Sequence, residues 1–176
     1  MGQRIWIRGT TGSGKSTLAK AISERLGIAQ VELDDLWHLP GWQVRPREEF
    51  FALLEENLGQ PSWVISGNYS VATEVILPKV TMVVWLDYSR GTSFWRLFRR
   101  TVSRVWNRKP CCNGNYESLW RSLSLDSILV WHLKTYSVNR KRIELAAQDP
   151  AFAHCRQIVL HNQAETDAWL SSLGNA

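Results

Sequence analysis

The chain has 176 residues, which is enough for one domain with a substantial hydrophobic core and too few for two ordinary domains. Its hydrophobic share of 44% and charged share of 21% are typical of globular proteins and exclude an intrinsically disordered chain. The net charge of +5 suits any polyanionic ligand and selects none.

Strand-like and helix-like patterns alternate along the chain and predict one domain. In chain order they are a strand at 4–8, a helix at 15–26, a strand at 29–33, a helix from 46 to 58, strands at 62–66 and 80–86, a helix at 90–106, an irregular segment at 107–116, a long helix at 117–148, a strand at 155–160 and a helix at 164–173. The run at 80–86 is almost continuously apolar, as in a parallel strand that is covered on both faces. Strands that alternate with helices favour an α/β fold of three layers, with a parallel sheet of these five strands between helices.

Cysteine content bears on the cellular compartment. Cys111, Cys112 and Cys155 are an odd number with two neighbours, so we expect reduced thiols in a cytoplasmic protein. No Cys-x-x-Cys pair is present that would chelate zinc. The longest apolar run is too short to cross a bilayer, and a motif begins too early for a signal peptide, so we expect a soluble protein without a membrane partner.

The segment Gly9–Thr17, with the sequence GTTGSGKST, matches G-x-x-x-x-G-K-[ST] between a predicted strand and a predicted helix. Its glycines let backbone N–H groups turn inward around phosphates, and the helix N-terminus adds its dipole. Lys15 is predicted to bridge the β- and γ-phosphates, and the Ser16 hydroxyl to ligate Mg²⁺. The residues predicted to bind a nucleoside triphosphate are Gly9, Thr10, Thr11, Gly12, Ser13, Gly14, Lys15, Ser16 and Thr17.

Other P-loop classes fit the sequence less well than kinases do. A GTPase carries an N-K-x-D motif, and the nearest match, Asn107–Pro110, lacks the acid. A motor or AAA-type ATPase needs a longer chain with further motifs. A small chain with a basic helix and an irregular loop after the fourth strand indicates a small-molecule or nucleotide kinase.

Several stretches resemble the adenylate-kinase-like proteins. They are VELDDLWHLPGW at 31–42, WVISGNYS at 63–70, VVWLDYSR at 83–90 and FRR at 98–100, and they are most similar to the branch labelled DNA topology modulation (FlaR-type) proteins. The resemblance implies a P-loop NTPase fold with a five-stranded parallel core, and ATP with Mg²⁺ as phosphoryl donor. It also implies a mobile lid inserted after the helix that follows the fourth strand, here at about 104–120.

One position departs from this resemblance. Relatives usually place an aspartate directly before GNY, where it helps to organise the magnesium shell, and here Ser66 stands there. Asp34 follows the second strand at the edge of the sheet where such folds bind ligands, so it is a candidate for the missing carboxylate. The alternative is that Asp34, together with Asp35, caps the following turn. Asp87 is either a metal-shell group or a structural partner for arginines.

The basic helix FWRLFRRTVSRVWNRK, at 94–109, holds six cations and no acid. Four of its arginines recur at steps of four residues. By resemblance, Arg96 and Arg100 lead into the lid, and Arg104 and Arg108 are lid arginines that close over the donor. The predicted catalytic residues are therefore Lys15, Arg96, Arg100 and Arg104, with Arg140 and Arg142 as further candidates for the clamp. Two alternatives stay open, a solvated basic face and a nucleic-acid surface with Trp95 and Trp106 stacking on bases.

The phosphoryl acceptor is expected in the loops after the second and third strands. The residues predicted to bind it are Asp34, Trp37, Trp42, Asn68 and Tyr69, with His38 beside them. Tryptophans there suit a flat ring such as a nucleobase, and they equally suit packing within the loop. We therefore predict an ATP-dependent phosphotransferase acting on a nucleotide or similar small acceptor. The alternatives are a small-metabolite kinase and a nucleotide-dependent regulator associated with nucleic acid.

Overall fold

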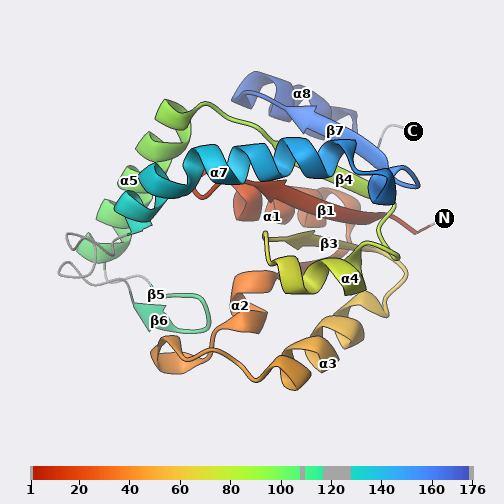
Figure 1. The fold of residues 1–176 in the computed structure, drawn as a ribbon, viewed down its shortest axis with the longest axis horizontal. Coiled ribbons are helices and arrows are strands. Elements are labelled where there is room, and N and C mark those ends of the chain that lie inside the picture. Colours follow the sequence, from red (N-terminus) through yellow and green to blue (C-terminus); the bar gives the residue numbers. More distant parts are fainter. Residues whose placement is uncertain (1, 108–109, 117–127, 175–176) are drawn as a thin grey trace.

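The computed structural model describes residues 2–107, 110–116 and 128–174. Its centre is a five-stranded sheet in the order β2-β3-β1-β4-β7, and every pairing in it is parallel (Figure 1). The strands are β1 Arg4–Gly9, β2 Ala29–Glu32, β3 Trp63–Ser66, β4 Met82–Leu86 and β7 Arg156–Leu160. β1 is the middle strand, so the loop that follows it opens at the centre of one edge of the sheet.

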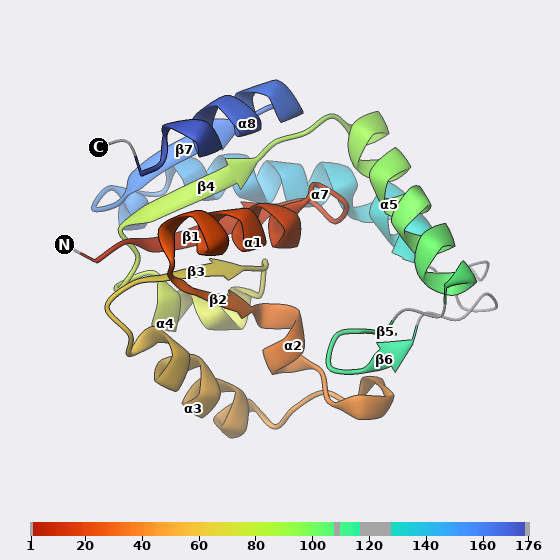
Figure 2. The ribbon, with the colours of Figure 1, turned by 180° about the vertical axis from the view of Figure 1, so that it is seen from behind.

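Helices cover both faces of this sheet, which gives the three predicted layers (Figures 1 and 2). Helices α1 and α8 lie on one face, and α3, α4 and α7 on the other. The helical elements are α1 Lys15–Leu26, α2 Leu33–Trp37, η1 Pro40–Trp42, α3 Arg47–Leu58, η2 Ser70–Ala72, α4 Thr73–Ile76, α5 Arg90–Trp106, α7 Ile128–Gln148, η3 Pro150–Phe152 and α8 Gln163–Ser172.

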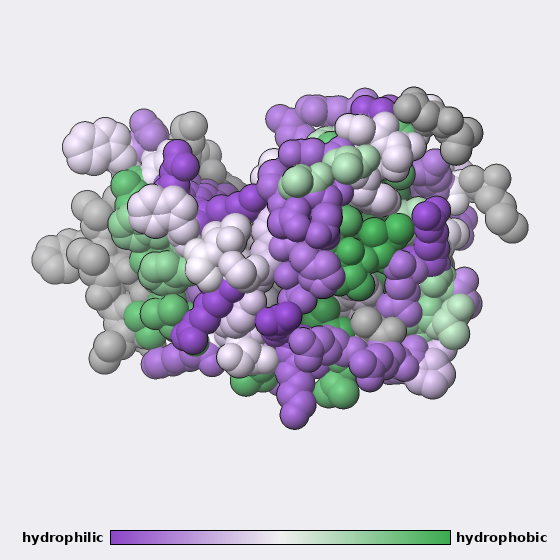
Figure 3. All heavy atoms as spheres, turned by 90° about the horizontal axis from the view of Figure 1, so that it is seen from above, coloured by the Kyte–Doolittle hydropathy of each residue, from purple (hydrophilic) through white to green (hydrophobic). Residues whose placement is uncertain are grey.

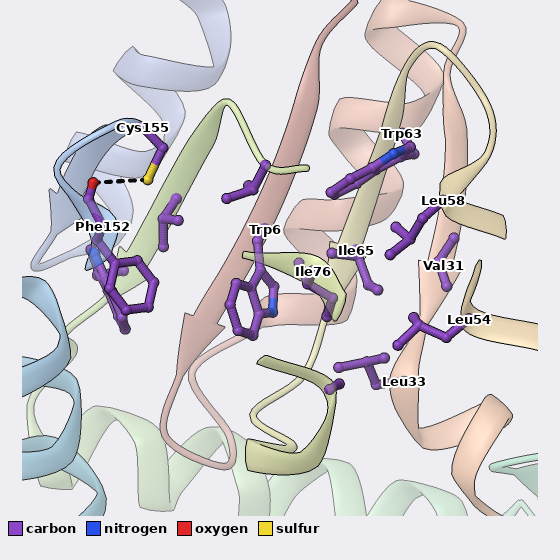
Figure 4. Packing of buried hydrophobic residues seen from close by; sticks show 14 of the residues in the cluster. Trp6, Val31, Leu33, Leu54, Leu58, Trp63, Ile65, Ile76, Phe152 and Cys155 are labelled. Atoms are coloured by element: carbon purple, nitrogen blue, oxygen red, sulfur yellow. Dashed lines mark hydrogen bonds between the residues drawn. The ribbon is translucent and has the colours of Figure 1, made fainter. Parts of the chain in front are cut away.

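Alternation along β1 divides the core into two clusters. Trp6 is fully buried on the face under α3 and α7, in one cluster with Trp63, Trp85 and Phe152. Figure 4 shows Trp6 between Phe152 and Ile76 in this cluster, and its ring stacks on that of Phe152. Ile5 and Ile7 point to the opposite face and pack with residues of α1 and α8. Burying apolar side chains on both faces fixes the register of this strand, because a slip of one residue would exchange the two sets.

The predicted α/β fold with a parallel sheet is confirmed, and most element ends shift by one or two residues. The second strand ends at Glu32, and Leu33 begins α2 with its side chain fully buried. Asp34 and Asp35 stand in the first turn of that helix, where negative charge favours the helix N-terminus. The strand was therefore expected to run one residue too far.

The segment at 107–116, predicted to be irregular, contains a hairpin of β5 Pro110–Cys111 and β6 Asn115–Tyr116. Its turn runs through Cys112, Asn113 and Gly114, with φ of 41°, 61° and 83°. Asn-Gly is the dipeptide that most favours such a turn, and this signal explains the hairpin. Arg108, Lys109 and residues 117–127 of the predicted long helix lie outside the described residues.

Hydrophilic side chains predominate on the face seen from above, with smaller apolar patches among them (Figure 3). Within the described part of the chain, no helix has both the length and the apolar character needed to cross a bilayer.

Candidate active site

The loop between β1 and α1 has the backbone that its glycines predict. Gly12 and Gly14 have φ of 82° and 97°, in the left-handed region that glycine adopts readily. A side chain at Gly12 would also collide with the carbonyl oxygen of Ser93 in α5. The glycine therefore lets α5 lie directly against the loop.

The N-terminus of α1 faces the cavity without a capping side chain. Gly14 occupies the N-cap position, no side chain caps the helix, and its first turn holds no acidic residue. The unpaired N–H groups of such a terminus and its dipole attract phosphate. The Nζ atom of Lys15 donates to the carbonyl oxygens of Gly9 and Thr10, at 2.9 and 3.0 Å, so its charge lies over the loop.

Burial lowers the pKa of Lys15 from 10.5 to about 8. Asp34 and Glu32 act in the opposite direction, and the positive charge of Arg100 adds to the lowering. A cation that is costly to keep charged here gains strongly from a phosphate beside it. This cost points to a polyanionic ligand.

Glu32, which was not among the predicted site residues, lies beside Ser16. The Oε2 atom of Glu32 accepts hydrogen bonds from the hydroxyls of Ser16 and Ser66, at 2.9 and 2.6 Å. Gln30 donates to the other oxygen of Glu32 at 2.7 Å. Hydroxyl and carboxylate oxygens are the protein ligands that Mg²⁺ takes beside substrate phosphates, so this set fits the ion.

Asp34 is the second residue of α2, and its side chain contacts the loop that follows β3. The hydroxyl of Tyr69 donates to its Oδ1 atom at 2.8 Å, and His38 lies 3.5 Å from the same hydroxyl. Burial and the charge of Asp34 raise the pKa of Tyr69, so the phenol stays protonated. Asp34 remains a predicted metal and acceptor residue, but the carboxylate hydrogen-bonded to Ser16 is that of Glu32.

Two of the residues predicted to bind the acceptor have structural partners. The side-chain amide of Asn68 makes two hydrogen bonds to the backbone of Gly9. Its Oδ1 atom accepts from the Gly9 N–H at 3.3 Å, and its Nδ2 atom donates to the Gly9 carbonyl at 2.5 Å. Trp37 packs its ring against Phe50 and Tyr69, with centroids 5.0 and 5.2 Å away. Of the two, Asn68 also lines the cavity.

Trp42 lines the same cavity, and its indole meets His38 edge to face at 5.5 Å. Its backbone has φ of 61°, which is rare for a bulky residue. That backbone is held by an N–H donated to the side chain of Asn115, at 2.8 Å.

Three arginines of α5 line the cavity beside the loop. Arg96 donates to the carbonyl of Ser13 at 3.3 Å and to Gln163 at 2.8 Å, and its guanidinium stacks on Tyr88. Arg100 and Arg104 line the cavity further along the helix. Their four-residue spacing therefore places three cations along one side of the site.

The two arginines of α7 have different surroundings. Arg140 pairs with Asp87 at 2.9 Å, and it does not line the cavity. Arg142 does line the cavity. Asp87 also lies 3.4 Å from His161. The described contacts of Asp87 therefore agree with the second of its two predicted roles, that of a structural partner for arginines.

These groups surround one cavity of about 1750 Å³. Its walls include most of the predicted phosphate-binding residues, from Thr11 to Thr17, together with Glu32, Asp34 and three of the arginines of α5, Arg96, Arg100 and Arg104. Asp35 and Cys112 also line the cavity, and neither was among the predicted site residues.

Comparisons with known proteins show the fold. No family model and no curated sequence matches the chain. Solved structures do match, among them shikimate kinase from Bacteroides thetaiotaomicron, with 16% identity and a TM-score of 0.52 over 98% of this chain and 96% of that one.

A gluconokinase from Sinorhizobium meliloti 1021 matches with 18% identity and a TM-score of 0.52, over 98% of this chain and 94% of that one. Shikimate kinase from Acinetobacter baumannii, in complex with shikimate, matches with 15% identity and a TM-score of 0.55, over 98% and 91%. The comparisons do not confirm the FlaR-type branch. What they show is that the chain has the α/β fold of P-loop kinases.

Proposed function

We propose that this protein is an ATP-dependent phosphotransferase that moves the γ-phosphoryl group of ATP to a hydroxyl group of a small acceptor. The observation that carries this proposal is the convergence on one cavity of an uncapped helix N-terminus, Lys15 and the Glu32–Ser16 pair. Asp34 opens on the same cavity. The fold shared with solved small-molecule kinases supports it.

In this proposal the loop and Lys15 hold the donor phosphates, and the arginines of α5 surround the transferring group. Phosphoryl transfer depends on positioning and on positive charge around the γ-phosphoryl, which planar guanidinium groups match well. Ser16 and Glu32 would hold magnesium, which supplies further positive charge at the phosphates when it is bound. The structural role left for Ser66 is to orient Glu32, because its hydroxyl donates to the same oxygen.

The acceptor end of the cavity has the opposite charge. Between Ala29 and Tyr69, the described residues that line it include Glu32, Asp34 and Asp35 and no lysine or arginine. The two arginines of this segment are engaged elsewhere, since Arg45 donates to the Leu36 carbonyl and Arg47 lies over Phe51. We infer that a hydroxylated acceptor without a phosphate of its own fits this end better than a nucleoside monophosphate does.

A nucleotide acceptor is the second candidate, and Trp42 is the observation in its favour. Its indole lines the cavity and offers a flat surface for a base. The phosphate of such an acceptor would depend on Arg142 of α7 or on the arginines of α5.

The candidate from another functional class is a nucleotide-dependent regulator associated with nucleic acid. Membership of the FlaR-type branch, which is labelled DNA topology modulation, is proposed together with this candidate. It is favoured by α5, whose outer side exposes 57% of Trp95 and 85% of Trp106. Aromatic rings beside arginines are the ingredients of a single-strand binding surface.

The test is to measure ADP release with ATP and Mg²⁺ against a panel of polyols, hydroxy acids and nucleoside monophosphates. We expect release that depends on one acceptor class and is lost in Lys15→Ala, while Lys134→Ala, an exposed lysine of α7, serves as the matched control. ADP release that no acceptor alters but DNA stimulates would overturn the kinase proposal in favour of the regulator. Transfer to a nucleoside monophosphate alone would reverse the order of the two acceptor classes.

A further inference from the structure

The hairpin β5–β6 rests on the segment that follows β2, and Asn115 makes the central contact. Its side chain is 4% exposed. The Oδ1 atom accepts from the N–H of Trp42 at 2.8 Å, and the Nδ2 atom donates to the carbonyls of Leu39 and Cys112 at 3.0 and 2.6 Å. One buried amide thus joins the hairpin turn to η1.

The neighbouring turn residue adds two contacts to the same segment. The backbone N–H of Asn113 donates to Oδ1 of Asp35 at 3.2 Å, and its side chain donates to the carbonyl of His38 at 3.3 Å. Because these groups lie 73 to 78 residues apart in the sequence, the contacts are tertiary and do not form a local turn motif.

The contact area lies on the cavity. Asp35, His38, Trp42 and Cys112 all line it. Tyr69, whose hydroxyl donates to Asp34, lines the same cavity. The hairpin turn therefore lies at the acceptor end of the cavity, against the segment from Asp35 to Trp42.

We propose that the turn Cys112–Asn115 forms the outer wall of the acceptor pocket, and that Asn115 is the positioning residue that holds this wall on η1. The proposal rests on the phosphotransferase function above and deepens it, because it assigns part of the predicted lid to the acceptor. A wall held over the acceptor keeps water from the donor phosphates and aligns the acceptor hydroxyl.

Substitution of Asn115 leaves specific partners without hydrogen bonds. In Asn115→Ala the N–H of Trp42 and the carbonyl of Leu39 lose their partner, whereas Asn115→Asp retains the acceptor and loses the donor. The matched control is Asn107→Ala, since Asn107 is exposed at the end of α5 and, among the described residues, its side-chain amide donates to Ser103 of the same helix.

Thiol labelling tests the wall without any acceptor. In a Cys111→Ser background, iodoacetamide labelling of Cys112 is followed by peptide mass spectrometry, with buried Cys155 as internal reference. We expect Asn115→Ala to accelerate labelling of Cys112 about tenfold, the factor that one or two lost hydrogen bonds correspond to, and Asn107→Ala to leave it unchanged. Equal labelling rates in all three proteins would overturn the proposal.

Kinetics test the positioning role. We expect Asn115→Ala to raise KM for the acceptor about tenfold and to leave the affinity for ATP unchanged, with Asn115→Asp between it and the unmodified enzyme. An equal rise in both constants, or none, would contradict the proposal. If ATP does not bind the unmodified protein at all, the phosphotransferase function fails, and the labelling result still decides the wall.

Should both variants fail to fold, hydrogen exchange of the unmodified protein decides the question. The Trp42 amide is expected to be protected to the same degree as the amides of β1, because Asn115 holds it. Exchange at the rate of an open loop would overturn the proposal.

Discussion

The donor end and the acceptor end of the cavity are built in different ways. The loop at the donor end is one continuous stretch, Gly9–Thr17, whose spacing sets the glycine backbone, the helix N-terminus and the position of Lys15 together. The acceptor end is assembled from η1, the Tyr69 loop and a hairpin that follows α5. The proposed phosphate loop is therefore local in sequence, whereas the proposed acceptor pocket depends on tertiary contacts.

Their charges differ as well. Cations line the donor end, with Lys15 at its centre and Arg96 and Arg100 beside it. Carboxylates line the acceptor end, through Asp34 and Asp35. Glu32 stands where the two meet, because its carboxylate bonds to Ser16 of the phosphate loop. The difference implies that donor and acceptor variants will alter different kinetic constants.

The largest effect is expected from Arg100→Ala, which removes one cation from the donor end. Because the proposed function places this charge beside the transferring phosphoryl group, we expect kcat to fall by roughly 10²-fold, the loss typical of a removed electrostatic stabiliser. The neighbouring Arg99→Ala is the matched control, since Arg99 is exposed on the same helix and lines a separate shallow depression. Steady-state ADP release measures both. Equal effects at the two positions would show that only the overall charge of α5 matters.

Glu32→Gln tests the boundary between the two ends. The amide retains the shape but loses the charge that a metal ligand or its partner needs, so we expect activity to fall by about 10- to 100-fold. The Mg²⁺-dependent gain in thermal stability of the ATP complex should shrink with it, which gives a readout apart from turnover. Asp34→Asn is the comparison.

If Asp34→Asn alone abolishes the Mg²⁺ effect while Glu32→Gln retains it, the metal belongs to Asp34, as the sequence predicts. If Glu32→Gln abolishes it, Asp34 is left to the acceptor.

The donor end could be predicted from the sequence more completely than the acceptor end. The P-loop spacing fixes both the backbone and the chemistry of the donor end, so its residues could be named in advance. Glu32 was missed because the second strand was expected to run to residue 33, and a glutamate within a strand carries no motif. The structure shows it at the strand's end, beside Ser16.

The acceptor end could be predicted only in part. The loops after β2 and β3 were expected to form it, yet the amide of Asn68 is bound to Gly9. Asn-Gly at 113–114 signals a hairpin, but no local pattern tells which distant segment a hairpin turn will contact. The contact between Asn115 and Trp42 depends on how α5 directs the chain, which is a property of the whole fold.

The pH dependence of ATP binding probes Lys15 at the donor end. Its pKa of about 8 means that the free protein loses this charge as the pH rises through 8, while bound phosphates favour the charged form. We therefore expect affinity to fall by up to about tenfold per pH unit above 8, with proton uptake on binding. Calorimetry in buffers of different ionisation enthalpy measures both quantities.

Stability changes with the opposite sign over the same range. Between about 8 and the ordinary value of 10.5 the unfolded chain binds more protons than the folded one, so the contribution of Lys15 to stability rises with pH. Lys15→Ala should remove both trends. An affinity for ATP that falls equally in this variant would assign the pH dependence to another group.

The smallest effect is expected from Asp87→Asn, which sharpens the boundary of the donor end. Asp87 follows β4 near the donor end, but it pairs with Arg140, whose side chain is 46% exposed. A pair with one partner this exposed contributes about 1 kcal/mol or less to stability, so we expect a slight loss in chemical denaturation and an unchanged kcat. Arg140→Ala should show a loss of similar size, and the double variant less than the sum of the two losses, because both variants disrupt the same ion pair. A fall in kcat with Asp87→Asn alone would instead place this carboxylate among the groups that act on the donor phosphates.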